Sequence, residues 1–459
     1  MALHRSARWV RLLTIFTLCF ALRLTVGAVI DATVPVIKRV DVYSDIASNI
    51  VRGQGFVAEV NGAPITWRAP LYPGFLAMIY SLFGEHNGMA VFIAQAALDS
   101  ISAVLIFSMG TRLFSESVGI FSAVSFALHP LSAYYSLRFM PEPLFTLAFT
   151  VVIKAWIMAV TTRRLMAYLV VGGLIAIAAL VKPVALGLWP FLVACTGYQL
   201  RQDPRRALAT ALALTIACLI VLTPWMLRNY QVTGRVILSA TGGGYAFWLG
   251  NQMVSEGRED WEVDGTTLEQ LFERRDTILA SASGRPSTPV PLSKRNRSFT
   301  EPVNFTAEED HEFFVAAWRE IASHPFDSVV LTGKKFFRFW FSIFLPANRW
   351  AQPCIIVFQT VFLSLAVLGM MKSHRQSVGL FLLLPPVVFV TVATTLMYAT
   401  IRYSIPVLPV MTILMVVGFL EVVRVLSGER EGPSNMSLRR LLQIKLLGKT
   451  VSLNRKRRP

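Results

Sequence analysis

The sequence predicts an all-α polytopic membrane protein with about ten or more transmembrane helices, joined by interfacial helices and outer loops. The chain has 459 residues, of which 54% are hydrophobic and only 15% are charged. Several runs of about 18 or more residues almost lack charge, which is the length that crosses about 30 Å of hydrocarbon as a helix. A mean hydropathy of +0.54 agrees with this fold class.

The formal net charge is +17. In a soluble protein such an excess would point to nucleic acid. Here the clustered Lys and Arg residues lie in short links between apolar runs and in the tail, as cytosolic loops of membrane proteins do. We therefore expect a lipid bilayer and no nucleic acid as partner.

The cysteines predict no disulfide framework and no zinc site. Each lies in or beside an apolar run, none forms a CxxC pair, and none has a histidine at ligand spacing. They are Cys19, Cys195, Cys218 and Cys354.

Apolar runs place the expected spans, the first of which follows a basic N-terminus. Because this run is long and interrupted by Arg23, we interpret it as an uncleaved helix rather than a signal peptide. The expected spans are 9–29, 88–110, 116–136, 142–161, 165–183, 185–200, 207–227, 352–371, 377–398 and 404–425.

Basic residues in the short links set the orientation. With alternating helices, the links at 112, 163–164, 201–206 and 372–375 all fall on the side of the basic N-terminus. Both termini are then cytosolic, with a membrane domain at 1–427 and a basic tail at 428–459. The outer segments are 30–87, 129–142 and 228–350.

The two longer outer segments have distinct parts. The run 71–83 is short and begins between two prolines, so we expect an interfacial helix rather than a span. Residues 228–250 are rich in Gly and aromatic residues and predict a platform at the membrane surface. Residues 255–312 are polar and predict an exposed excursion, and 311–345 predict an interfacial helix.

Candidate catalytic acids lie in the outer segments. Asp41 and Asp45 are four residues apart and share a helix face, where a carboxylate can take a proton from a nucleophile. A solvated face is the simpler alternative. Glu142 lies between two prolines at a helix start, which is a favourable place for an acid. It is either an end charge or faces Asp41 across a cavity and positions substrate or a metal.

Cations at outer helix ends form the second group. The positive-inside bias would move them inward, so we expect them to hold a fixed anion such as a lipid phosphate. Snorkelling to head groups is the alternative for each. They are Arg68, Lys182, Arg228 and Arg402, the last with its neighbour Tyr403.

Asp99 lies near the middle of the second expected span. An intramembrane acid is a functional candidate. It could equally hydrogen-bond a neighbouring helix, through Ser100 or Ser102 on its own turn, so it is kept outside the expected site.

Several motifs resemble one family of membrane enzymes. They are YSDIASNIVRGQGF and RAPLYPG in the first outer segment, PEPLF at Glu142, VKP at Lys182, TPWMLRNYQVTGRVILSATGGGYAFWLGN, and RYSIPVLP at Arg402. In this order, over most of residues 10–425, they resemble the GT-C superfamily of glycosyltransferases, of the protein mannosyltransferase and aminoarabinose transferase type.

The resemblance implies transfer of a monosaccharide from a polyprenyl-phosphate donor to a lipid, glycan or protein acceptor, with inversion. The reaction would take place on the periplasmic or external side of a bacterial inner membrane. The family's first-loop acid matches Asp41, which would be the general base. The family places this acid about four residues before the loop tyrosine, whereas Asp41 is two before Tyr43, so Asp45 and Asp31 remain alternatives.

The resemblance also assigns the cations and leaves the metal open. Arg68, Lys182, Arg228 and Arg402 would stabilise the leaving phosphate. Some relatives use a divalent metal ion and others do not, and the sequence contains no dedicated ligand cluster that decides.

Two other function classes remain as alternatives. A lipid or small-solute transporter would place broken helices and ionisable residues at mid-membrane. An oligosaccharide ligase or polymerase would share the architecture and take a diphosphate-linked oligosaccharide. We favour the monosaccharide transferase, because the acids and cations cluster at one face.

Overall fold

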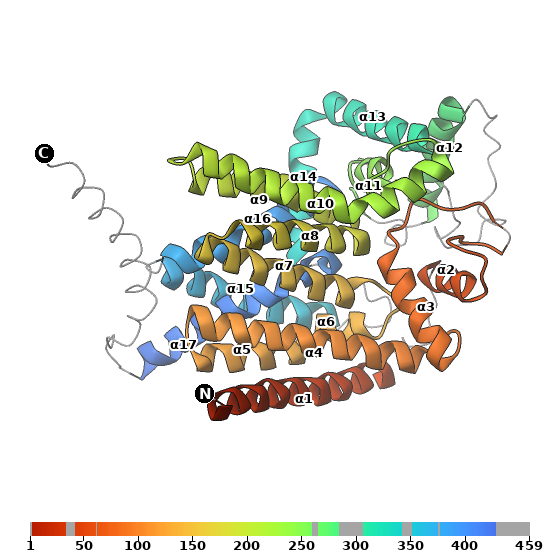
Figure 1. Cartoon of the computed structure of the whole chain (residues 1–459). Coiled ribbons are helices and arrows are strands. Elements are labelled where there is room, and N and C mark those ends of the chain that lie inside the picture. Colours follow the sequence, from red (N-terminus) through yellow and green to blue (C-terminus); the bar gives the residue numbers. More distant parts are fainter. Residues whose placement is uncertain are drawn as a thin grey trace, which may run out of the picture.

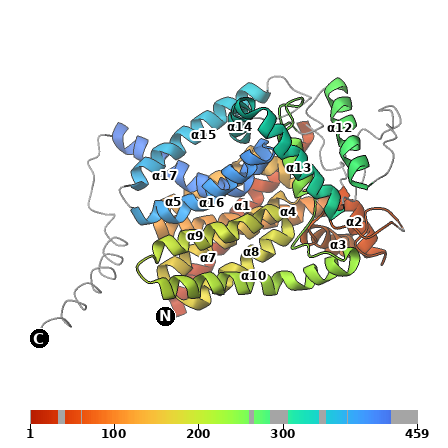
Figure 2. The same cartoon turned by 90° about the horizontal axis from the view of Figure 1, so that it is seen from above.

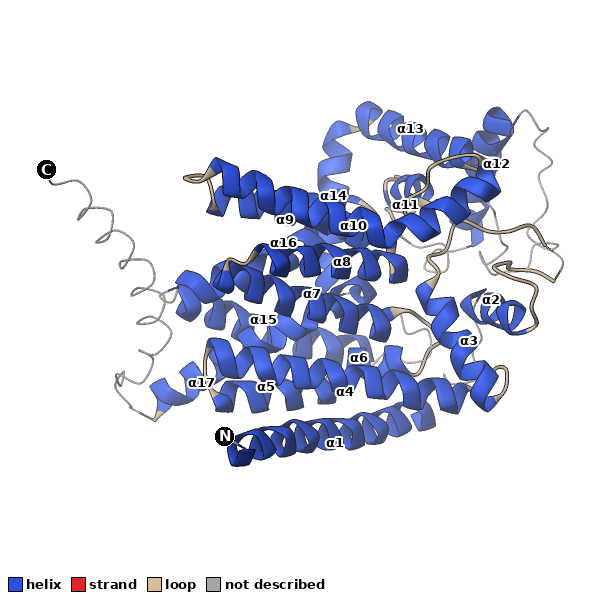
Figure 3. Cartoon of the chain, viewed as in Figure 1, coloured by secondary structure: helices blue, strands red, loops and turns tan. Residues whose placement is uncertain are grey.

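The structure is a computed structural model that describes residues 2–33, 42–60, 62–258, 265–283, 306–341, 351–374 and 377–427. The described residues form helices joined by loops, with no strand among them (Figure 3). Of the expectations above, Asp41, Arg375 and the tail at 428–459 lie outside these residues.

Six helical segments are long and apolar enough to cross a membrane. They are Trp9–Ala32 in α1 (Ala2–Thr33), α4 (Gly88–Leu113), α7 (Glu142–Thr162), α10 (Pro204–Thr233), Pro353–Ser373 in α15 (Ala351–His374), and Ile401–Leu426, which joins η4 (Ile401–Val407) to α17 (Leu408–Leu426). The pair α5 (Glu116–Leu128) and α6 (Pro130–Ser136), bent by 54°, makes a seventh if it is one span. The chain is therefore a polytopic α-helical membrane protein.

The other three expected spans coincide with shorter or broken helices. The segment 165–183 is α8 (Leu165–Val181), which stops before Pro183 because proline lacks the N–H that a continuing helix needs. The segment 185–200 is divided between η1 (Pro183–Gly187) and α9 (Leu188–Gln199). The segment 377–398 is α16 (Ser377–Leu396), with two prolines inside it.

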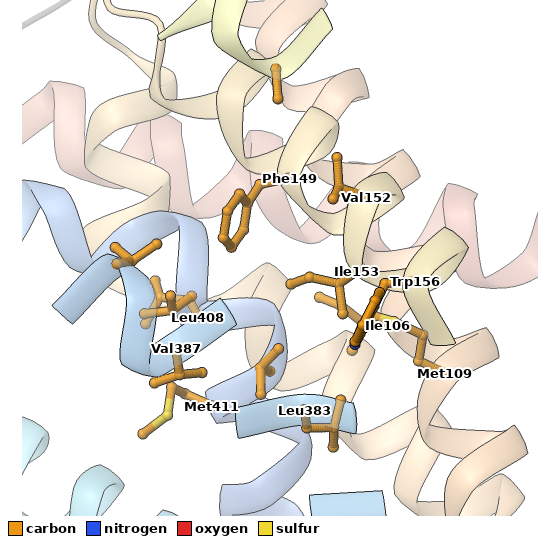
Figure 4. Close-up of a cluster of buried hydrophobic side chains, with 14 of the residues drawn as sticks. Ile106, Met109, Phe149, Val152, Ile153, Trp156, Leu383, Val387, Leu408 and Met411 are labelled. Carbon is orange, nitrogen blue, oxygen red and sulfur yellow. The ribbon is translucent and has the colours of Figure 1, made fainter. Parts of the chain in front are cut away.

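The long helices run side by side as a bundle (Figures 1 and 2). Its centre is packed by side chains from α4, α7, α16 and α17 (Figure 4). Phe149 and Trp156 of α7 are fully buried there. Where helices touch most closely there is no room for a side chain: a Cβ at Gly172 of α8 would collide with the carbonyl of Leu214 in α10.

A buried ion pair joins α1 to the interior. Arg23 Nε lies 3.3 Å from Asp99 Oδ2, and both side chains are at most 2% exposed. The hydroxyl of Ser136 in α6 donates to the same carboxylate oxygen. The partner on a neighbouring helix is therefore Ser136; the expectation of Ser100 or Ser102 was wrong, because both hydroxyls donate to carbonyls of their own helix.

The expected outer segments contribute short helices at one end of the bundle. α2 (Val42–Val51), α3 (Leu71–Phe83) and α12 (Gly265–Ser283) lie at the end opposite the start of α1 (Figures 1 and 2). α3 has 13 residues, which is short for a span.

The large outer segment is more helical than its polar composition suggests. It contains α11 (Gly243–Gly250), α12, α13 (Ala307–Ser323) and α14 (Pro325–Phe341). α13 begins with a capping box, in which Thr306 and Glu309 satisfy each other's backbone N–H groups. α11 and α13 pack through aromatic rings, with Trp248 against Phe313 at 5.2 Å.

Candidate active site

Three of the expected site residues meet at the end of the bundle near α3. Glu142, the first residue of α7, has a side chain that is 1% exposed. Lys182 Nζ donates to its Oε1 at 2.9 Å, and Arg402 Nε lies 3.3 Å from the same oxygen. We call Glu142, Lys182 and Arg402 the charged cluster.

Helix ends explain why these residues converge. Proline follows Glu142 in the first turn of α7, where the missing N–H costs nothing. Lys182 is the C-cap residue directly after α8, and Arg402 is the second residue of η4. Each side chain therefore extends from the end of an element, and the three ends meet.

Two tyrosines complete the surroundings of the cations. Lys182 Nζ lies 4.6 Å from the ring centroid of Tyr403, which attracts a cation through its π face. Arg402 Nη2 donates to the hydroxyl of Tyr403 at 2.6 Å. That hydroxyl donates in turn to the hydroxyl of Tyr398 at 2.7 Å.

Among the described residues, Lys182 and Arg402 share the carboxylate of Glu142, so the three side chains of the charged cluster carry a net positive charge. The side chains of Lys182 and Arg402 are 13% and 18% exposed, so both retain a small accessible surface. In a partly buried place this charge is screened less than it would be in water. The cluster is therefore suited to hold an anion.

An apolar groove begins directly beside the cluster. Its volume is about 460 Å³, and it lies between α3, α7 and α8. The lining residues follow helical spacing on each helix: Leu71, Gly74, Phe75 and Met78; Leu144, Leu147, Ala148 and Val151; and Leu174, Ile177 and Val181. Leu144 lies two residues after Glu142 and Val181 directly precedes Lys182, so the groove and the cations are adjacent.

The first outer segment provides a further cation, Arg68, near an exposed acid. Asp45 is exposed on α2, whereas Asp31 is half-buried near the end of α1. The guanidinium of Arg68 lies 4.1 Å from the ring centroid of Trp67 and 5.0 Å from that of Tyr43. Tyr43 lies two residues before Asp45, so Arg68 is held against the helix that carries this acid.

α2 is fixed in place by a histidine from the turn after α3. His86 Nδ1 lies 2.9 Å from the hydroxyl of Ser44, and its Nε2 lies 3.4 Å from that of Ser48. Asn49 also donates to the carbonyl of Val57 at 3.0 Å. These contacts orient α2 and so determine where Asp45 points. The sequence analysis did not single out His86. The only signal for it in the sequence is a lone histidine in the polar stretch Glu-His-Asn that follows the apolar run 71–83.

Arg228 has a different environment from the charged cluster. Its Nη1 donates to the carbonyl of Ile65 at 2.6 Å, and its guanidinium lies 5.3 Å from the ring centroid of Phe56. These contacts tie the loop after α2 to α10. Of the four expected phosphate cations, Lys182 and Arg402 come together, whereas Arg68 and Arg228 each contact residues of the first outer segment.

Metal binding gains no support from the described part of the chain. It contains no group of three or more His, Cys, Asp or Glu side chains placed to hold an ion.

Comparisons with known proteins agree with this architecture. Residues 67–227, which include Glu142 and Lys182, match the family model of dolichyl-phosphate-mannose-protein mannosyltransferases. No curated protein sequence is significantly similar to this chain.

Two solved structures that resemble this one are of an archaeal oligosaccharyltransferase. The archaeal oligosaccharyltransferase AglB from Archaeoglobus fulgidus, in complex with an inhibitory peptide and a dolichol-phosphate, has a TM-score of 0.52 at 10% identity. The alignment covers 96% of this chain and 54% of that one, so this chain spans about half of its length. The apo form of the Archaeoglobus fulgidus enzyme gives 0.52 at 12% identity, over 95% and 54% of the two chains.

A further structure has a lower score. ArnT from Cupriavidus metallidurans, bound to undecaprenyl phosphate, has a TM-score of 0.40 at 15% identity, over 89% of this chain and 78% of that one. A score below 0.5 does not establish a common fold. The family match and the fold shared with the archaeal enzyme together support a GT-C superfamily membrane glycosyltransferase.

Proposed function

We propose that the protein transfers a monosaccharide from a polyprenyl-phosphate-linked donor to a lipid, glycan or protein acceptor, with inversion. The observation that carries the proposal is the adjacency of the charged cluster and the apolar groove. A polyprenyl phosphate has an anion at the end of a long apolar chain, and this site offers a cationic end and an apolar run in that order.

The two parts of the site have different roles. Lys182 and Arg402 bind the donor phosphate through charge-assisted hydrogen bonds. The groove receives the first part of the prenyl chain, and its volume is within the usual range for ligand pockets of about 300–1,000 Å³. The prenyl chain already lies in the hydrocarbon of the bilayer before it binds. The groove therefore aligns the donor by shape rather than by removing apolar surface from water.

The reaction follows from this placement. A carboxylate of the first outer segment, Asp41 or Asp45, takes the proton of the acceptor hydroxyl or amine. The freed electron pair attacks the anomeric carbon on the face opposite the phosphate. The carbon–oxygen bond to the phosphate breaks, and its electron pair remains on the phosphate oxygen, where Lys182 and Arg402 stabilise the charge. Displacement from the opposite face inverts the anomeric centre.

Glu142 is a positioning residue in this scheme rather than the base. Its carboxylate oxygen Oε1 is already within 3.3 Å of both cations, and the side chain is 1% exposed. A carboxylate in this position bridges Lys182 and Arg402 and so fixes the directions in which the two cations point. Arg68, stacked beside α2, is placed to contact the donor's sugar-phosphate from the side of the acid.

The proposed location is a bacterial inner membrane, with this end of the bundle on the periplasmic or external side. The support is the grouping of α2, α3 and α12 opposite the start of α1, which has a basic N-terminus (Figure 1). The likeness to an oligosaccharyltransferase favours one alternative, transfer of a diphosphate-linked oligosaccharide. A transporter has less support, because the mid-bundle acid Asp99 is neutralised by Arg23.

The test supplies reconstituted protein with a polyprenyl-phosphate-linked monosaccharide and a cell-envelope extract as the acceptor source. Release of polyprenyl phosphate, together with labelled sugar in the acceptor fraction, is expected. The variant Arg402→Ala should raise the donor KM about tenfold or more. Arg424→Ala is the matched control, since Arg424 pairs with Glu421 within α17 instead. Turnover of a diphosphate-linked oligosaccharide alone would favour the ligase, and turnover of neither donor would refute the proposal.

A further inference from the structure

A fully buried lysine contacts the end of α16, the helix that precedes Arg402 in the chain. Lys335, in α14, has 0% exposure. Its ammonium donates to Asn251 Oδ1 at 3.0 Å, to the carbonyl of Met397 at 2.9 Å and to the carbonyl of Leu396 at 3.3 Å. These bonds use all three of its N–H groups. Within the described residues no carboxylate lies at ion-pair distance from it.

The oxygens that Lys335 binds belong to the end of α16. Leu396 is the last residue of that helix, and carbonyls at a helix end lack partners within the helix. A cation is favoured there by the helix dipole. Asn251 strengthens the cap, because its Nδ2 donates to the carbonyl of Leu396 at 3.1 Å. Lys335 therefore caps α16 from another helix.

The capped segment leads directly into the site. Met397 is followed by Tyr398, whose hydroxyl accepts from Tyr403, and by Arg402, which contacts Glu142. The backbone leaves little room for adjustment here. A Cβ at Gly250 would collide with the carbonyl of Met397, so α11 packs directly on this segment.

We infer that Lys335 is a positioning residue for the donor: its buried ammonium fixes the end of α16, and this in turn places Arg402 and Tyr403 against Glu142. The inference rests on the proposed role of Arg402 in holding the donor phosphate. Lys335 itself contacts neither the charged cluster nor the groove in the described structure, so it acts through the backbone of residues 396–403.

The burial of Lys335 makes this cap sensitive to pH. Burial, and next the nearby cation of Arg338, lower the pKa of Lys335 to about 7. On the same helix, Lys334 and Arg338 both pair with Glu256, at 2.7 and 3.1 Å. η4, which packs against α14, carries one charged side chain, Arg402. Below about pH 7 the ammonium makes three bonds; above it the neutral amine has two N–H groups and no charge, so the cap weakens.

The first experiment measures kinetics against pH. In wild type, the donor KM should rise about threefold or more between pH 6 and pH 8.5, with kcat changing less. Lys335→Met should have the high KM at both pH values. Lys334→Met is the matched control, a neighbouring exposed lysine on the same helix, and should follow wild type. A Lys335→Met enzyme with wild-type KM and pH profile would overturn the inference.

A second variant covers the possibility that Lys335→Met does not fold. Asn251→Asp places a carboxylate 3 Å from the ammonium and so favours its charged form. The rise in donor KM should then move to higher pH by one unit or more. An unchanged midpoint would show that another group titrates and would refute the assignment.

A third measurement does not depend on the proposed chemistry. Hydrogen exchange of the amides at 397–407 should be faster in Lys335→Met than in Lys334→Met at one fixed pH. If the wild type turned over no polyprenyl-phosphate sugar while this difference was present, the proposed function would fail and the cap would stand. Equal exchange in the two variants would remove the cap itself.

Discussion

Replacing Glu142 with glutamine tests whether its carboxylate holds the charged cluster together. Glu142→Gln keeps the shape of the side chain but removes its charge, leaving Lys182 and Arg402 next to an amide. Unit charges 4 Å apart interact by about 4 kcal/mol at an effective dielectric constant of about 20, and the contacts here are 2.9 and 3.3 Å. Because two partly buried cations lose the negative charge of Glu142, we expect the free energy of unfolding to fall by about 3–5 kcal/mol.

The assay is unfolding of the detergent-solubilised protein, free of donor lipid. Glu116→Gln is the matched control: Glu116 pairs with Arg11 at 3.0 Å, but the two side chains are 51% and 62% exposed. Such a surface pair contributes about 1 kcal/mol or less. Adding Lys182→Met to Glu142→Gln should recover part of the loss, since one uncompensated cation is removed. Equal effects of Glu142→Gln and Glu116→Gln would refute the reasoning.

Two further predictions concern the bundle. Gly172→Ala should reduce the yield of folded protein, because its Cβ would collide with the carbonyl of Leu214. Gly173→Ala should be tolerated, since the nearest atom to its Cβ, Cγ2 of Val221, would be 3.6 Å away. The yield of detergent-stable protein measures both effects. Arg23→Met alone should destabilise by about 3–5 kcal/mol by leaving Asp99 unpaired, while Arg23→Met combined with Asp99→Leu should be near neutral. A double variant as unstable as the single one would contradict the ion-pair explanation.

The fold class and most helix positions follow from the sequence by itself, because a bilayer imposes a length and a polarity on each crossing segment. The same rule predicts unbroken spans at 165–183 and 185–200. The structure instead contains a short 3₁₀ helix that begins at Pro183, between two shorter α-helices. The sequence alone also marks Glu142, Lys182 and Arg402 as site candidates, since each is a charged residue at the end of an apolar run.

Only the tertiary structure decided which of these charges meet. In the sequence, Lys182 and Arg228 are both cations at the outer end of an apolar run. In the structure, Lys182 binds Glu142, whereas Arg228 binds the backbone of the first outer segment. Lys335 lies in the segment 311–345, for which the sequence predicts an interfacial helix. Its burial against the end of α16 depends on packing between segments about 60 residues apart. The bilayer constrains the length and polarity of each helix separately, so the sequence alone predicts the helices. Hydrogen-bond partners depend on how the helices pack together, so only the tertiary structure shows them.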